Sequence, residues 1–204
     1  MDYVAVLAEE FRTIKDTARQ YKKYMAPFKV GILNAWGSIR SWIDDDINDW
    51  TKPYRGGVQE CLSGMNIELA FLSFDEVLEN GIPSDINVLI NSGDAYTSWS
   101  GGEYWKNVKL AELIRNFVYN GGGLIGIGDP TACQYEGHFF QLFDVLGVDR
   151  EMGPSKSTAR WPFEPVKEHF LLEDGIVKEE MMHKKDGVFI NTMDTDVILA
   201  DEFN

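Results

Sequence analysis

The sequence has 204 residues, a hydrophobic content of 44% and a formal net charge of −14. This length suits one folded domain with its own core. The acidic balance argues against non-specific binding to nucleic acid or to an anionic membrane, since both need a basic surface. A local phosphate site is not excluded, because one arginine and a few backbone amides suffice for it.

Two cysteines, Cys61 and Cys133, indicate no disulfide framework. Residues 1–15 contain acidic side chains and lack the apolar stretch of a signal peptide. No apolar run approaches the roughly 20 residues of a membrane-spanning helix. We therefore expect a cytoplasmic protein without membrane contact.

Residues 1–25 are predicted to form one long amphipathic helix that ends before Pro27. Its apolar residues recur at spacings of three and four and make a single stripe: Val4, Leu7, Phe11, Ile14, Ala18, Tyr21 and Met25. Such a stripe needs a covering surface. Packing against the sheet of the same chain is the simplest expectation.

The segment 29–42, Lys-Val-Gly-Ile-Leu-Asn-Ala-Trp-Gly-Ser-Ile-Arg-Ser-Trp, is predicted to be a buried parallel strand followed by a loop. Small residues around Gly37 let a ligand approach the backbone, and Arg40 offers a planar cationic fork for phosphate or carboxylate. A purely structural interpretation also fits, in which Trp36 and Trp42 close the end of the core. Both interpretations stay open on residue types alone.

The acidic cluster that follows, Asp44 to Asp46 with Asp49, lacks the glycine-containing ligand loop of a hard-cation site. We interpret it as solvated charge and expect no metal site.

The next 80 residues alternate between apolar strands and helical stretches. The expected elements are a helix over 53–62, a strand over 65–73, a helix over 74–78 that ends near Gly81, a strand over 86–91, a helix over 108–119 that ends at Asn120, and a strand over 123–128. This rhythm is typical of βαβ units.

The loop 92–102 follows the third strand and contains Asp94, Tyr96 and Trp99 among small residues. Open α/β sheets bind ligands at the carboxyl ends of their strands. This loop is therefore a second candidate for function.

Gly121, Gly123 and Gly126 spell G-x-G-x-x-G, but they lie before and within a strand rather than after it. The dinucleotide fingerprint needs the order strand, glycines, helix, so this match is accidental and no cofactor is expected. The turn 128–131 stands at the end of the fourth strand, and a helix predicted over 135–146 would let its amides meet an anion.

The same turn occupies the place of the nucleophile elbow in glutamine-amidotransferase-like folds, but it reads Gly-Asp-Pro where a cysteine or serine is required. Cys133 comes too late, and His138 is expected on the following helix, close to Cys133 in sequence. We expect a structural thiol here rather than a nucleophile.

Prolines divide residues 153–166 into extended pieces, and His169 is predicted to be a turn or capping residue. Residues 187–191 and 195–200 are expected to form a terminal hairpin or two edge strands.

Together these elements predict a three-layer α/β sandwich with a mainly parallel sheet, flavodoxin-like or class I glutamine-amidotransferase-like, preceded by the long helix. The loops after the first, third and fourth strands would meet at one edge of the sheet: 34–42, 92–102 and 128–131.

Four segments in order resemble 1,3-β-galactosyl-N-acetylhexosamine phosphorylases, also known as lacto-N-biose or galacto-N-biose phosphorylases. They are residues 29–42, residues 2–4 followed by 10–16, Trp99-Ser-Gly-Gly102, and Val145-Leu-Gly-Val-Asp149. The resemblance covers nearly the whole chain and points to the central α/β domain of that family.

What the resemblance implies is a domain within a larger enzyme. Residues 1–26 would then be the connection from a preceding barrel domain, which carries the catalytic acid, and residues 27–204 would be the α/β domain. The full enzyme cleaves β-1,3-galactosyl-N-acetylhexosamine with phosphate to galactose 1-phosphate and N-acetylhexosamine. This chain would supply no catalytic residue and would be inactive alone.

The family pattern places the phosphate and substrate contacts at the same edge of the sheet. The expected residues are Arg40 as the main phosphate ligand, with Trp36, Gly37, Trp99, Gly101, Asp129 and Thr131. An alternative from another class stays open: a non-catalytic α/β binding or oligomerisation module, similar to the trimerisation domains of some β-galactosidases. The amphipathic first helix leaves a homo-oligomer open as well.

Overall fold

The structure is a computed structural model. It describes residues 9–17, 28–34, 57–95, 97, 99–152, 156–157, 164–165, 167–170, 187–188, 190–193, 195–197 and 199–200.

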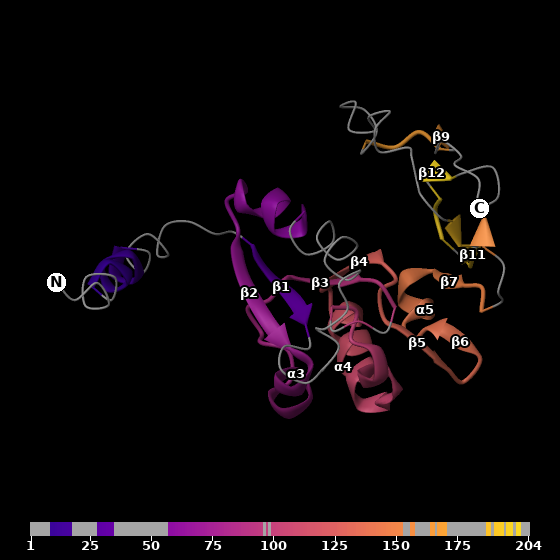
Figure 1. The fold of residues 1–204 in the computed structure, drawn as a ribbon, viewed down its shortest axis with the longest axis horizontal. Coiled ribbons are helices and arrows are strands. Elements are labelled where there is room, and N and C mark those ends of the chain that lie inside the picture. The colour runs from indigo at the N-terminus through magenta and orange to yellow at the C-terminus, as the bar shows by residue number, and fades with distance from the viewer. Residues whose placement is uncertain are drawn as a thin grey trace.

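A four-stranded parallel sheet forms the centre of the molecule (Figure 1). Its strands are β1 (Lys29–Asn34), β2 (Glu68–Ser73), β3 (Val88–Gly93) and β4 (Gly123–Gly128), in the spatial order β2-β1-β3-β4. Every neighbouring pair runs parallel. The predicted mainly parallel sheet is therefore confirmed, and its carboxyl ends all lie at one edge.

The connections between these strands are helical, as the βαβ rhythm predicts. They comprise a helix over residues 57–63, α3 (Phe74–Asn80), η1 (Gly102–Lys106) and α4 (Val108–Tyr119). The helix predicted over 108–119 is confirmed in full, and the one predicted over 74–78 extends to Asn80. Residues 53–56 of the helix predicted over 53–62 lie outside the described stretches.

The ends of the helices follow from local side-chain chemistry. At α3, the Ser73 hydroxyl accepts a hydrogen bond from the Glu76 amide while the Glu76 carboxylate accepts one from the Ser73 amide, which is a capping box. Gly81 then ends α3 with φ +76. At α4, the Asn107 side chain accepts from the Lys109 amide, and Asn120 follows the last turn.

Helices pack on both faces of the sheet, which makes an α/β sandwich. On one face Leu33, Leu72 and Leu89 pack with residues of α3 and α4. On the other face Val30, Ile32 and Ile90 pack against Val58 and Leu62 of the 57–63 helix. Adjacent residues of β1 thus enter different clusters, because successive side chains of a strand point to opposite faces.

After β4 the chain forms a β-hairpin, so the helix predicted over 135–146 is wrong. The observed elements are β5 (Ala132–Tyr135), β6 (His138–Phe140), the short helix α5 (Phe143–Leu146) and β7 (Val148–Arg150). Glu136 and Gly137 both have positive φ, 51° and 86°, between the paired residues Tyr135 and His138. This backbone conformation belongs to a two-residue type I′ hairpin turn, and it cannot continue a helix.

The hairpin is held by a side chain that a helix would have placed elsewhere. Gln141 Nε2 donates to the backbone carbonyls of Cys133, Tyr135 and His138 at 2.7, 3.1 and 3.1 Å. One side chain thus contacts both strands of the hairpin, next to the register shift between Ala132 and Tyr135.

The last third consists of short antiparallel ladders. β8 (Lys156–Ser157) pairs with β10 (Gly187–Val188), β7 pairs with β11 (Ile190–Thr192), and β9 (Glu164–Pro165) pairs with β12 (Leu199–Ala200). The two predicted terminal strands therefore exist in part, but each pairs with an earlier segment. The alternative of a terminal hairpin is wrong for the described residues.

The described part of the predicted N-terminal helix, residues 9–17, is helical and lies apart from the sheet (Figure 1). Phe11 and Ile14 of its apolar stripe are 69% and 63% exposed, so these two residues do not pack against the sheet. Other residues of the predicted stripe lie outside the described stretches.

Candidate functional site

The loops after β3 and β4 start side by side at the carboxyl edge of the sheet. The two strands end in register, with Gly93 opposite Gly128, and the Asp129 amide donates back to the Gly93 carbonyl at 2.9 Å. The predicted convergence is confirmed for these two loops. The loop after β1 lies outside the described residues.

Asn91, near the end of β3, joins these loops through a fully buried carboxamide. Its Nδ2 donates to the carbonyls of Trp99 and Ser100, both at 3.2 Å. Its Oδ1 accepts from the Thr131 amide at 2.7 Å. One side chain therefore sets the distance between the Trp99 segment and the Asp129-Pro-Thr131 turn.

Hydrogen bonds within the first of these loops fold it into a compact turn. The hydroxyls of Thr97 and Ser100 both donate to the Asp94 carbonyl at 2.6 Å. The indole N–H of Trp105, a buried core residue, donates to the Ser100 carbonyl. The backbone that carries Trp99 is thus fixed from within and from the core.

Gly101 has a physical reason to be glycine in this position. Its φ is +102°, and a Cβ there would lie 2.6 Å from the Phe74 ring and 2.7 Å from the Trp105 indole nitrogen. Side chains of L-residues rarely adopt this conformation. The Trp99-Ser-Gly-Gly102 motif therefore passes over the end of the core with its backbone in close contact with two aromatic rings.

Asp129 connects the β4 end to two other segments. Its Oδ2 lies 2.7 Å from Nη1 of Arg150 on β7, and the same oxygen accepts from the Ala95 amide at 3.3 Å. Both charged side chains are 17% exposed. The Arg150 guanidinium also lies over the Phe139 ring, 4.5 Å from its centroid, which adds a cation–π contact.

Asp149, the last residue of the Val145–Asp149 motif, organises the neighbouring hairpin. Its Oδ1 accepts from the amides of Phe139, Phe140 and Arg150 at 3.1, 2.9 and 2.8 Å. Its Oδ2 lies 2.8 Å from His138 Nδ1. The His138 ring stacks on Phe143 with the centroids 3.7 Å apart, so this imidazole is held on two sides.

Four of the seven predicted site residues therefore lie in one hydrogen-bonded region: Trp99, Gly101, Asp129 and Thr131. The structure gives Asp129 and Thr131 protein partners, since Thr131 is fully buried and its hydroxyl accepts from the Leu142 amide at 3.3 Å. Trp36, Gly37 and Arg40 lie outside the described stretches.

The anion site expected at the turn after β4 needs correction. A strand, β5, follows the turn, so no helix N-terminus faces it. The amides of Asp129 and Thr131 donate to Gly93 and Asn91. Anion binding by a helix terminus at this turn is therefore ruled out by the fold.

The thiol and imidazole near this turn do not form a nucleophile–base pair. Cys133 is 1% exposed within β5, and burial raises the pKa of its thiol, so it stays neutral at pH 7. His138 is on β6 rather than on a helix, and its Nδ1 is engaged with Asp149. The interpretation of Cys133 as a structural thiol is consistent with both facts.

Three residues of the network were not among the predicted site residues: Asn91, Asp149 and Arg150. Asn91 reads in the sequence as part of an apolar strand, and a polar residue at a buried strand end is the signal that marks it. Asp149 and Arg150 come at the end of a recognised motif, where charge next to an apolar run is the corresponding signal.

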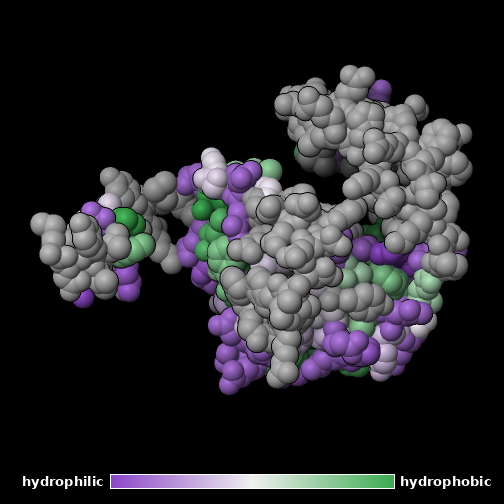
Figure 2. Space-filling view, in the orientation of Figure 1, coloured by the Kyte–Doolittle hydropathy of each residue, from purple (hydrophilic) through white to green (hydrophobic). Residues whose placement is uncertain are grey.

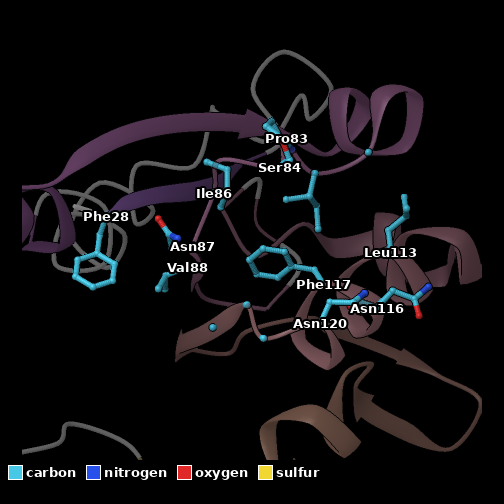
Figure 3. Close-up of a pocket in the computed structure, with 15 residues that line it drawn as sticks. Phe28, Pro83, Ser84, Ile86, Asn87, Val88, Leu113, Asn116, Phe117 and Asn120 are labelled. Atoms are coloured by element: carbon cyan, nitrogen blue, oxygen red, sulfur yellow. The ribbon is translucent and has the colours of Figure 1, made fainter. Parts of the chain in front are cut away.

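A separate pocket of about 910 Å³ opens at the opposite, amino edge of the sheet. Ile86, which precedes β3, faces Phe117 of α4 across the pocket (Figure 3). One of its lining asparagines, Asn87, already accepts a hydrogen bond from the Lys29 amide at 2.8 Å. We place the candidate site at the carboxyl edge, because open parallel sheets bind ligands there and the polar network lies there.

Two further findings concern the described residues alone. No group of three His, Cys, Asp or Glu side chains in these stretches has the arrangement of a metal site. None of the described helices is long and apolar enough to cross a bilayer.

Comparison with known proteins gives close relatives. The profile of the lacto-N-biose phosphorylase central domain matches residues 29–204. The chain is 42% identical over 179 residues to a 1,3-β-galactosyl-N-acetylhexosamine phosphorylase of Lachnoclostridium phytofermentans, and 40% identical over 181 residues to the enzyme of that name from Bifidobacterium longum subsp. longum. In both cases the aligned region is 85% of this chain and 24% of the relative.

A relative with a different substrate name also matches. It is the D-galactosyl-β-1,4-L-rhamnose phosphorylase of Lachnoclostridium phytofermentans, 30% identical over 190 residues, which are 92% of this chain and 26% of the relative. This chain thus spans about a quarter of the length of the curated relatives it matches. The profile match covers nearly all of the chain, and the chain belongs to the lacto-N-biose phosphorylase central domain family.

Proposed function

We propose that this chain is the central domain of an inverting phosphorylase that cleaves β-1,3-galactosyl-N-acetylhexosamine with phosphate. The products are galactose 1-phosphate and N-acetylhexosamine. The observation that supports this most is 36–42% identity to three enzymes named for that substrate class. In this proposal residues 1–26 connect to a preceding barrel domain, and residues 27–204 form the α/β domain.

The chemistry divides between domains in a simple way. An oxygen of phosphate forms a bond to the anomeric carbon as the bond from that carbon to the bridging oxygen breaks, and a carboxylic acid protonates the departing oxygen. Because phosphate is itself the nucleophile, one acid is enough. The acid belongs to the barrel, and this domain contributes charge and hydrogen-bond donors that hold phosphate in line.

The proposed contacts lie at the carboxyl edge. Arg40 is the main phosphate ligand, with Trp36 and Gly37 beside it. The Trp99–Gly101 backbone shapes the site from the β3 side, and Asp129 and Thr131 close it from the β4 side. The support for this grouping is that the last two segments already share Asn91 as a common hydrogen-bond partner.

The names of the relatives support assigning this domain to one half of the reaction. They share a galactosyl group and phosphorolysis, whereas N-acetylhexosamine in three of them is replaced by rhamnose in the fourth. A domain that all four enzymes share is expected to serve the part of the reaction that they share, which is attack of phosphate on the galactosyl group. We therefore assign phosphate to this domain and acceptor preference to the rest of the enzyme.

The strand order also supports a finer assignment of the fold. The order β2-β1-β3-β4 in a parallel sheet is that of the first four strands of flavodoxin-like proteins. We propose this topology for the sheet, with the β5–β6 hairpin in place of the next crossover helix.

A second candidate function is an α/β binding or oligomerisation module without a role in phosphorolysis. The exposed Phe11 and Ile14 favour it, since an apolar stripe on a described helix offers a surface for self-association. Sedimentation of the chain, alone and with Phe11→Ser, tests for the self-association that an oligomerisation module requires, and a monomer in both cases would reject that module. A stable oligomer that dissociates in the variant favours the module.

The proposed phosphate ligand is tested in a full-length phosphorylase that contains this domain. Arg40→Ala should raise KM for phosphate by roughly 10- to 100-fold, since a hydrogen bond to a charged group contributes about 1.5–3 kcal/mol, and should change KM for the disaccharide far less. Arg115→Ala is the control, because Arg115 pairs with Asp144 of α5 and is not among the proposed phosphate contacts. An equal rise of both KM values in Arg40→Ala would reject Arg40 as a phosphate ligand.

A further inference from the structure

Arg150 on β7 joins this strand to the carboxyl edge of the sheet through a charged contact. Its Nη1 donates to Asp129 Oδ2 at 2.7 Å. Three parts of the fold hold Arg150 itself. Its backbone amide donates to Asp149, its guanidinium lies over the Phe139 ring, and its neighbour on β11 is Ile190.

Asp129 also contacts the loop after β3. The Asp129 oxygen that receives Arg150 also accepts from the Ala95 amide. Ala95 follows Asp94, whose carbonyl receives both the Thr97 and the Ser100 hydroxyls. A displacement of Asp129 would therefore be transmitted to the backbone that carries Trp99.

The Arg150–Asp129 pair is held in one arrangement because both side chains are mostly shielded from water. Both side chains are 17% exposed, and Nε of Arg150 is buried without a hydrogen-bond partner. If Arg150 is removed, the mostly buried Asp129 carboxylate loses its charged partner. It then regains hydration by turning outward, away from the Ala95 amide. Charge pairing in this position thus decides where the Asp129 oxygen points.

We propose that Arg150 is a positioning residue of the phosphate site: it acts through Asp129 to hold the Asp94–Ala95 segment, and with it the Trp99–Gly101 backbone, in the arrangement that receives the ligand. The inference rests on the proposed function for the identity of the ligand. Its mechanical part, the control of Ala95 by Arg150, stands on the geometry alone.

The mechanical part is tested on the 204-residue chain by amide hydrogen exchange at Ala95. Arg150→Ala should raise the exchange rate about tenfold or more, because it removes a charge-assisted partner of the Ala95 acceptor. Arg150→Lys keeps the charge without the planar fork and should recover part of the protection. Asp129→Asn keeps an acceptor for Ala95 and should perturb it less than Asp129→Ala.

Two comparisons make this test specific. The double variant Asp129→Ala/Arg150→Ala should exchange no faster at Ala95 than Asp129→Ala alone, since Arg150 acts through Asp129. Arg115→Ala removes another arginine–aspartate pair, with Nε 2.7 Å from Asp144 Oδ2, and should leave Ala95 unchanged. Unaltered exchange in Arg150→Ala, or a further increase in the double variant, would overturn the inference.

The functional part is tested in a full-length phosphorylase that contains this domain. Arg150→Ala should raise KM for phosphate with kcat unchanged, because it weakens ground-state and transition-state binding alike. In Arg150→Lys the KM for phosphate should rise less than in Arg150→Ala. A fall in kcat at constant KM would overturn the positioning role. Faster exchange at Ala95 with normal phosphate KM would leave the mechanical coupling in place and reject phosphate as the ligand of this loop, a result separable from failure of the Arg40 test.

Discussion

At the scale of single residues, the candidate site depends on polar side chains that are used by the protein itself. Asn91 is fully buried, yet its amide donors and its carbonyl oxygen each have partners. A buried carboxamide is tolerated only when it is satisfied in this way. The two carbonyls that face Nδ2 also fix which way the amide points, so asparagine cannot be exchanged for aspartate without penalty.

We predict that Asn91→Asp destabilises the chain by about 3–5 kcal/mol at pH 7, because it puts an uncompensated carboxylate opposite two carbonyl oxygens. The folded-state pKa of the new carboxyl would be raised, so the loss should shrink as pH falls and the group becomes neutral. Chemical denaturation between pH 4 and pH 7 measures this.

The matched control is Asn116→Asp on the exposed side of α4, which should change stability by no more than about 0.5 kcal/mol. A loss at Asn91 that is equally small at pH 7 would show that water reaches this carboxamide and that the two loops are not joined through it.

At the scale of elements, the regular helices follow their sequence signals and the hairpin does not. The Ser73–Glu76 capping box and Gly81 bound α3, and both can be read from residue type and spacing. The β5–β6 turn is built on Glu136 and Gly137, and Glu-Gly is not among the dipeptides that mark a type I′ turn most strongly. Its neighbours contain apolar residues at spacings that also fit a helix, so tertiary contacts such as those of Gln141 decide the outcome.

The elements on either side of the hairpin are joined by an ion pair. Arg115 on α4 places Nε and Nη2 at 2.7 and 3.0 Å from the two oxygens of Asp144 on α5. Desolvation opposes ionisation of Asp144, but the hydrogen bonds and charge of Arg115 outweigh it and lower the pKa of Asp144 from its ordinary 3.8. The folded state therefore binds this proton less readily than the unfolded state does.

We predict that Arg115→Ala lowers stability by about 0.5–1 kcal/mol at pH 7, the usual range for a partly exposed pair. For a carboxyl with a depressed pKa, the stabilisation is complete above the ordinary value of 3.8 and is lost as pH falls below it. The difference between wild type and variant should thus narrow from pH 5 to pH 2, as measured by urea titrations across that range. A difference independent of pH would assign the effect to the Arg115–Gln141 contact instead.

At the scale of the whole molecule, the described sheet is not fully covered. Phe71 on β2 and Ile125 on β4 are 52% and 48% exposed, and hydrophobic surface is visible along β2 (Figure 2). Parallel sheets are normally buried on both faces.

We predict that the 204-residue chain alone does not phosphorolyse galactosyl-β-1,3-N-acetylglucosamine, because the proposed function assigns the acid that protonates the departing sugar oxygen to another domain. Release of galactose 1-phosphate, followed with a coupled assay, measures this. A full-length relative serves as the positive control in the same assay. Turnover by the chain itself would contradict the proposed division of labour.

Much of the architecture was readable from residue pattern. Apolar runs with interleaved amphipathic helices determined the βαβ units, because hydrophobic periodicity and capping are local properties. The ordered motifs determined the family, which the profile match over residues 29–204 confirms. A cytoplasmic location and the ligand-binding roles of all seven predicted site residues stay predictions.

Tertiary structure alone decided how the carboxyl edge is assembled. Asn91 meets Thr131 across 40 positions of the chain, and Arg150 meets Asp129 across 21. No local pattern encodes such contacts, because a polar side chain at a buried strand end or after an apolar motif is compatible with many hydrogen-bond partners. Which partner the side chain meets depends on the strand order and on the hairpin that replaces the predicted helix, and both are properties of the packed chain.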